Sequence, residues 1–161
     1  MDSVRFTAAT RPRTGDLDEL RRRRAELRET MTALERSICA PVADQPTTWI
    51  DHTRVAAGDL AAEFVDHITV TEGPGGLHQD ILAGDLRLAN QVDTLTADHQ
   101  AITDEIRMLI ADLDAAGAVP AADLAALRER AAALLAHLAR HRQRGADLIY
   151  EAFQTDIGGG D

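Results

Sequence analysis

The feature that most constrains the fold is a set of apolar stripes with helical spacing. Around residues 49–70, 88–113 and 124–152, apolar side chains recur three or four positions apart. This repeat places them on one face of an α-helix. A fourth stripe, around residues 17–38, has the same spacing. Because no strand-like alternation extends over more than a few residues, the sequence predicts an all-helical chain.

Three of these stripes each contain one inward-facing histidine. His67, His99 and His141 occupy positions that a helix would direct into the core. A buried imidazole costs about 1–3 kcal/mol unless a partner satisfies it, so a single such residue is usually just a hydrogen-bonded core residue. Three of them are harder to explain in that way. Four-helix bundles build metal sites from imidazoles and carboxylates that project inward from facing helices.

Glycine, proline and capping residues indicate where the first two helices begin and end. We expect the first helix to open at Asp16, with Glu19 completing a capping box. The second should cover about residues 47–72. Residues 73–76, Gly-Pro-Gly-Gly, must interrupt it, because proline cannot donate to the helical ladder and glycine removes backbone restraint.

The second half of the chain predicts two more helices. We expect one long helix over residues 77–113, with a kink near Gly84. The last helix should have Pro120 in its first turn, where a missing N–H costs least. It should fray near Ile157.

Four amphipathic helices joined by short breaks predict an antiparallel up-down four-helix bundle. We expect this bundle to cover residues 15–157. Residues 1–14 are expected to form a flexible N-terminal arm, and residues 158–161 a flexible tail.

Charge and hydropathy limit the partners that such a chain can have. The 27 acidic and 17 basic side chains give a net charge of −10, which is a poor match to the phosphates of nucleic acids. No run approaches the ~20 apolar residues of a membrane span, and no signal peptide is recognisable. We therefore expect a cytoplasmic protein that binds neither nucleic acid nor membranes.

Two features of composition add to this expectation. Lysine is absent and alanine is abundant, which indicates a GC-rich bacterial genome. The single cysteine, Cys39, fits a reducing compartment, and we expect it to be a small buried residue and not a reactive thiol. The sequence leaves open whether two copies pair through a helix face to form a homodimer.

The order of the histidines resembles a known family. DHITVTEGPGGL around His67, ADHQAI around His99 and AHLARHRQRGADLIYEAF around His137 and His141 are similar to the motifs of hemerythrin-like, or HHE cation-binding, domains. In that family, helix one carries a His, helices two and four carry His-x-x-x-Glu, and helix three carries a His. The resemblance covers roughly residues 17–153. It implies a four-helix bundle with a non-heme di-iron site.

At three positions where the family pattern has a metal ligand, this chain has a different residue. Helix one has no histidine, and Arg24 lies where an inward ligand is expected. Thr71 and Gly145 stand at the two positions expected to be glutamate. Glu72, one residue late, and His137, on helix four, are the replacements that the chain offers. The site that the resemblance implies is therefore di-iron, a rebuilt mononuclear centre, or empty.

The candidate metal ligands are thus three core histidines and two replacements: His67, Glu72, His99, His137 and His141. The remaining two histidines are not expected to join them. His52 lies about 22 Å from His67 along a helix. His78, beside the glycine-rich break, is expected to be exposed to solvent or at the rim of the bundle.

Three functions follow from these residues. The first is a hemerythrin-like iron protein that binds or processes a small molecule such as oxygen, nitric oxide or peroxide. The second is a metal-free bundle of the same fold, acting as a structural or interaction protein, in which His99 and His141 bond to carboxylates such as Glu63 or Glu105. The third is a pathway enzyme with a histidine general base, for which the sequence identifies no substrate.

Overall fold

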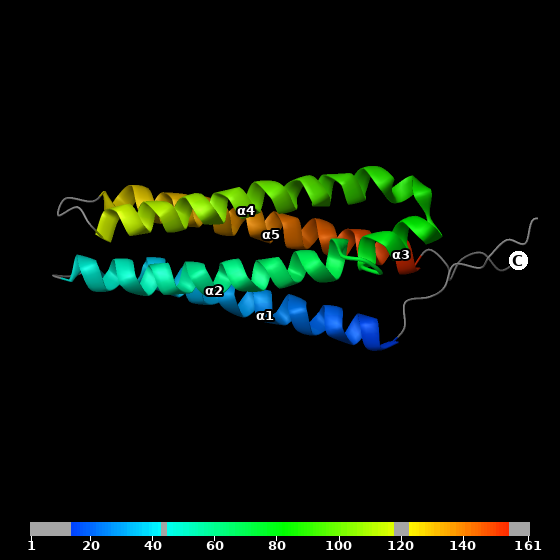
Figure 1. Cartoon of the computed structure of the whole chain (residues 1–161), viewed down its shortest axis with the longest axis horizontal. Helices are drawn as coiled ribbons and strands as arrows, with labels where there is room; N and C mark the ends of the chain where they lie inside the picture. The colour runs from blue at the N-terminus through cyan, green and yellow to red at the C-terminus, as the bar shows by residue number, and fades with distance from the viewer. Residues whose placement is uncertain (1–13, 43–44, 118–122, 155–161) are drawn as a thin grey trace, which may run out of the picture.

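The computed structural model describes residues 14–42, 45–117 and 123–154. Over these ranges the chain is helical and contains no strand. The long helices lie side by side along the long axis of the molecule, and a short helical segment lies at one end (Figure 1). The long helices are α1 (Thr14–Cys39), α2 (Pro46–Glu72), α4 (Ala89–Gly117) and α5 (Leu124–Gln154), and a short helix α3 (Leu77–Gly84) and a 3-10 turn η1 (Leu86–Leu88) connect α2 to α4.

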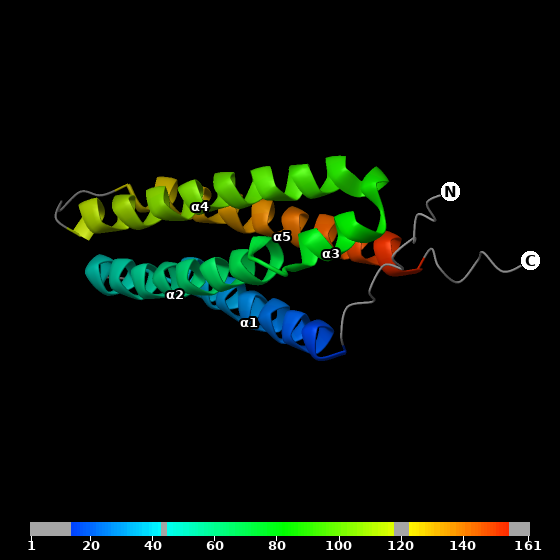
Figure 2. The ribbon, with the colours of Figure 1, turned by 45° about the vertical axis from the view of Figure 1, so that its right-hand side comes forward.

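The long helices pack against one another in a closed order. Helix α1 contacts α2, α2 contacts α4, α4 contacts α5, and α5 contacts α1. Figure 2 shows from a second direction that α1 and α2 lie together, as do α4 and α5. These contacts are consistent with a helical bundle. In the part of the chain that the structure describes, no helix has an apolar stretch that could cross a membrane.

The predicted stripes form the core, in two apolar clusters. The larger cluster contains Phe64, Ile102 and Leu138, and the smaller contains Leu95 and Leu148. Each fully buried side chain of this size stabilises the fold by about 1.5–3 kcal/mol. His67 of α2, His99 of α4 and His141 of α5 lie within the apolar stripes that supply these core residues. The core histidines therefore lie in a polar layer within an apolar interior.

The turn after α2 is the break that the sequence predicts. Gly75 has a φ of +71°, in the left-handed region where glycine is favoured. A Cβ on Gly76 would lie 2.7 Å from the carbonyl oxygen of Thr71, so no larger residue fits there without a shift. This compact turn directs α3 back against the bundle.

Three expectations about the helices are wrong. Helix α1 is already formed at Thr14, so Asp16 lies inside the helix and does not open it. The helix predicted over residues 77–113 is broken and not kinked, because Asp85 adopts an extended backbone (φ −149°, ψ 101°) and its carboxylate accepts a hydrogen bond from the backbone N–H of Arg87. Cys39 is exposed, because Ile38 takes the core position in the last turn of α1.

Some predictions fall on residues that the structure does not describe. These are Pro120, Ile157, the tail at 158–161 and the N-terminal arm except for Thr14. The start of α2 at Pro46 and its end at Glu72 agree with the predicted range to within one residue.

Candidate metal centre

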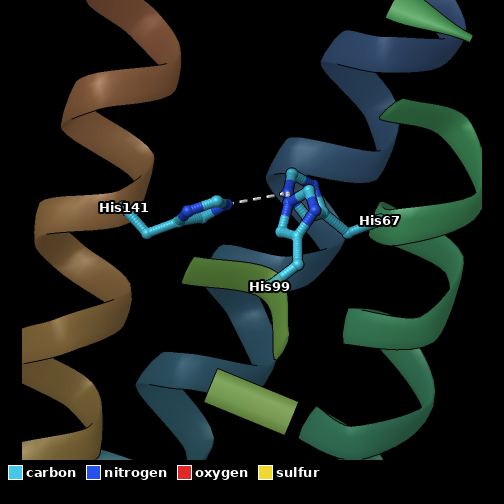
Figure 3. A group of neighbouring side chains, drawn as sticks. All are labelled: His67, His99 and His141. Atoms are coloured by element: carbon cyan, nitrogen blue, oxygen red, sulfur yellow. Dashed lines mark hydrogen bonds between the residues drawn. The ribbon is translucent and has the colours of Figure 1, made fainter. Parts of the chain in front are cut away.

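Three histidines from three helices meet in the core. His67 of α2, His99 of α4 and His141 of α5 are 8%, 3% and 2% exposed. Figure 3 shows their rings pointing at one another across the space between the helices. The Nε2 atom of His67 lies 3.1 Å from Nε2 of His141 and 3.2 Å from Nε2 of His99. The side chains of all three residues offer nitrogen atoms within 4.8 Å of one another.

These separations match a shared cation. Nitrogen atoms bound to one metal ion at about 2.1 Å lie roughly 3.0–3.4 Å apart at octahedral or tetrahedral angles. The two Nε2 distances from His67 fall within that range. The three histidines therefore form a group that could hold a metal ion.

Carboxylates lie behind two of the three rings. Nδ1 of His99 bonds to Oε1 of Glu72, and Nδ1 of His141 lies 3.4 Å from Oδ2 of Asp98. A carboxylate beside Nδ1 favours a proton on that nitrogen, which leaves a lone pair on Nε2. The carboxylates therefore leave the Nε2 atoms of His99 and His141 as acceptors that face His67.

His67 cannot satisfy both of these lone pairs. Its Nδ1 is buried and has no hydrogen-bond partner among the described residues. Its Nε2 carries at most one hydrogen, while two neighbouring Nε2 atoms require a donor. A cation between the three rings would accept the Nε2 lone pairs of all three histidines at once.

Burial keeps these imidazoles neutral. Desolvation, with repulsion from neighbouring histidines, lowers the pKa of both His67 and His99 to about 3. Desolvation also lowers the pKa of His141, although Asp98 opposes this effect. Neutral imidazole is the form that binds metal ions, so the rings are ready to bind at neutral pH.

Asp98 links the site to a second histidine on α5. It lies 2.8 Å from Nη1 of Arg144 and 3.5 Å from Nε2 of His137. Burial opposes ionisation, but these donors together hold the pKa of the Asp98 carboxyl below its usual value. His137 in turn bonds through Nδ1 to Glu105 at 2.8 Å.

The five predicted ligands thus separate into two groups. His67, His99 and His141 converge, whereas Glu72 lies behind His99 and His137 lies towards Asp98 and Glu105. The two positions where the family has glutamate supply no carboxylate in this chain: the hydroxyl of Thr71 donates to the carbonyl of His67, and Gly145 has no side chain.

The expected position of His78 is wrong. It is buried, and its ring stacks on His99 with a centroid distance of 5.8 Å and an interplanar angle of 4°. The turn at residues 73–76 brings α3 back against α4 and so creates this contact. His52 is exposed, in agreement with its predicted exclusion from the site.

A small cavity of about 30 Å³ adjoins the histidines. This volume has room for one or two water molecules. Arg24, which stands where the resemblance implies a helix-one ligand, is part of its wall. The other lining residues are Leu20, Leu27, His67, Thr71, Leu77, His78, Leu95, His99, His141, Arg142, Gly145, Leu148 and Ile149.

Two residues beside the histidines were not predicted from the sequence as part of the site. Asp98 directly precedes His99 in the sequence, but its contacts are with His141 and His137. Arg144, three residues after His141, forms an ion pair with Asp98 and was the one sequence feature that could have indicated an acidic partner here. Arg142 lies in a polar stretch, and nothing in the pattern distinguishes it from its neighbours.

No family model, curated protein or solved structure matches the chain, so the resemblance to hemerythrin-like domains stays a prediction.

Proposed function

We propose that the chain is an antiparallel up-down four-helix bundle of the hemerythrin-like kind that holds non-heme iron through His67, His99 and His141. The observation that supports this most is the arrangement of the ring nitrogens. The carboxylates of Glu72 and Asp98 occupy the Nδ1 side of two rings, and the Nε2 atoms of all three rings face one another. Imidazole suits iron, zinc, copper and nickel, and the family resemblance favours iron among these.

The ligand set supports a single ion. Three nitrogen atoms converge, and no carboxylate among the described residues joins them in a group of this kind. A two-metal centre would need further ligands and a bridging group, for which Glu72 would have to leave His99. A three-nitrogen site leaves coordination positions open, and the adjoining cavity has space for a small molecule such as oxygen, nitric oxide or peroxide.

A metal-free bundle is the second candidate, and one observation favours it. The hydrogen bonds within the group, together with Glu72 and Asp98, already give each ring at least one partner. The carboxylates are not the ones named from the sequence, since Glu105 contacts His137 and the Glu63 carboxylate has a buried oxygen without a hydrogen-bond partner among the described residues. In this case the histidines would serve the fold alone.

Metal content separates the two candidates. We expect protein purified without oxygen to contain about one iron per chain by elemental analysis. The His99→Leu variant should lose the metal, because it removes one of three converging nitrogen atoms. The matched control is His52→Leu, which removes an exposed histidine of α2 and should keep the metal. No iron in the wild type, and no binding of added ferrous iron, would support the metal-free bundle instead.

A further inference from the structure

Two arginines line the cavity beside the histidines. Arg24 reaches it from α1 and Arg142 from α5, and both side chains are partly buried. Nη2 of Arg24 donates to the backbone carbonyl of Arg142 at 3.4 Å. Nε of Arg142 is buried and has no hydrogen-bond partner in the described part of the chain.

Neither guanidinium is neutralised by a carboxylate of the described residues. Other arginines are paired, such as Arg23 with Asp66 and Arg144 with Asp98. The chain carries ten more acidic than basic side chains, so acids are not scarce. Both charges are partly shielded from water and no carboxylate in the described part of the chain compensates them, so an anion bound between them would lower that cost.

The electrostatics agree with this interpretation. Desolvation and the nearby charge of Arg142 lower the pKa of Arg24. Desolvation and the charge of Arg28 lower the pKa of Arg142. Positive charge therefore accumulates at this side of the cavity, next to rings that are neutral.

The size of the cavity limits which anion can enter. The cavity is small, about 30 Å³, so it favours an anion of few atoms over the larger tetrahedral phosphate and sulfate. A planar guanidinium matches the two oxygen atoms of a small oxyanion in a forked pair of hydrogen bonds.

We propose that this cavity binds a small, singly charged oxyanion of the size of formate or nitrite, held between Arg24 and Arg142 beside the three histidines. The site needs no metal ion, because the two guanidiniums supply the attraction. If the proposed iron is present, the anion offsets the repulsion between that cation and the guanidiniums. Anion binding would then give a reason for an arginine at position 24, where the family pattern has a histidine.

Melting temperature in the presence of formate tests this proposal. Metal-free protein in chelator is titrated with sodium formate up to about 20 mM, with sodium sulfate at matched ionic strength as the comparison. We expect saturable stabilisation by formate, with a dissociation constant of about 1 mM, near the ceiling for a three-atom ligand. Sulfate, which is larger than formate, should give no saturable effect over the same range.

Variants of the two arginines test whether formate binds in this cavity. Arg142→Gln and Arg24→Gln should each weaken formate binding about tenfold, because a charge-assisted pair of hydrogen bonds is lost. The matched control is Arg140→Gln, which removes an exposed arginine of the same helix and should bind formate as the wild type does. The proposal is overturned if wild-type protein responds equally to formate and sulfate, or if both cavity variants bind formate as tightly as the control.

Discussion

At the scale of single residues, the site depends on what lies behind each imidazole. Glu72 contacts Nδ1 of His99 and Asp98 lies beside Nδ1 of His141, and these contacts determine which nitrogen keeps its lone pair. The histidines themselves were predictable, because each interrupts an apolar stripe. The role of Glu72 behind His99 was not, because helical spacing gives the face of a residue but not the ring nitrogen that it meets.

The first prediction concerns Glu72. Replacing it by glutamine keeps the shape of the side chain but removes the negative charge behind His99. The basicity of His99 then falls, and we expect iron affinity to fall about 10–100-fold. Competition with a chelator of known affinity measures this change.

Glu129→Gln provides the control, because it changes an exposed glutamate of α5 in the same chemical way. Equal iron affinities in the two variants would show that Glu72 does not support a metal-binding histidine.

At the scale of helices, the apolar repeat predicted every long helix, and local chemistry predicted the turn after α2. The full break at Asp85 could not be predicted, because a single glycine such as Gly84 is tolerated inside a helical pattern. The burial of His78 depends on how α3 folds back onto α4, which no local signal specifies. Tertiary packing therefore added a fourth histidine beside the predicted three.

The second prediction tests this turn with two glycine substitutions. Gly76→Ala should destabilise the fold by about 1–3 kcal/mol, because its Cβ would lie 2.7 Å from one backbone oxygen and 2.8 Å from another. Gly58→Ala, inside α2, meets nothing within 4 Å and should stabilise the fold by about 0.5–1 kcal/mol. Urea denaturation measures both changes. If Gly76→Ala is as stable as Gly58→Ala, the described turn is incorrect.

At the scale of the whole molecule, a neutral polar layer is enclosed in an apolar interior. The histidines sit within a core of leucine, isoleucine and phenylalanine, and Phe64 packs on His67 with a centroid distance of 5.6 Å. Because the buried histidines bind protons less readily than they do in the unfolded chain, their protonation is linked to the stability of the entire fold.

The third prediction follows from this linkage. An unfolded histidine has a pKa of about 6.5, whereas burial lowers the folded pKa of His67 and His99 to about 3. Between these values the unfolded state binds more protons, so stability is fully present above about pH 6.5 and is lost as the pH falls. Each histidine contributes up to about 1.4 kcal/mol per pH unit.

Urea denaturation of metal-free protein between pH 7 and pH 5 measures this slope, since most carboxylates stay ionised over that range. His99→Leu should show a shallower decline, because it removes one of the groups that must bind a proton on unfolding. His52→Leu should keep the wild-type slope. A wild-type stability that does not change between pH 7 and pH 5 would mean that the histidines are not buried as described.

The central claim is that three imidazoles hold one iron ion, and X-ray absorption spectroscopy of the iron-loaded protein tests it most directly. Scattering from the outer ring atoms of imidazole distinguishes histidine ligands from oxygen ligands. We predict about three imidazole nitrogens near 2.1 Å from each iron, reduced in His141→Leu. An iron environment made only of oxygen atoms, unchanged in that variant, would contradict the assignment of His67, His99 and His141 as ligands.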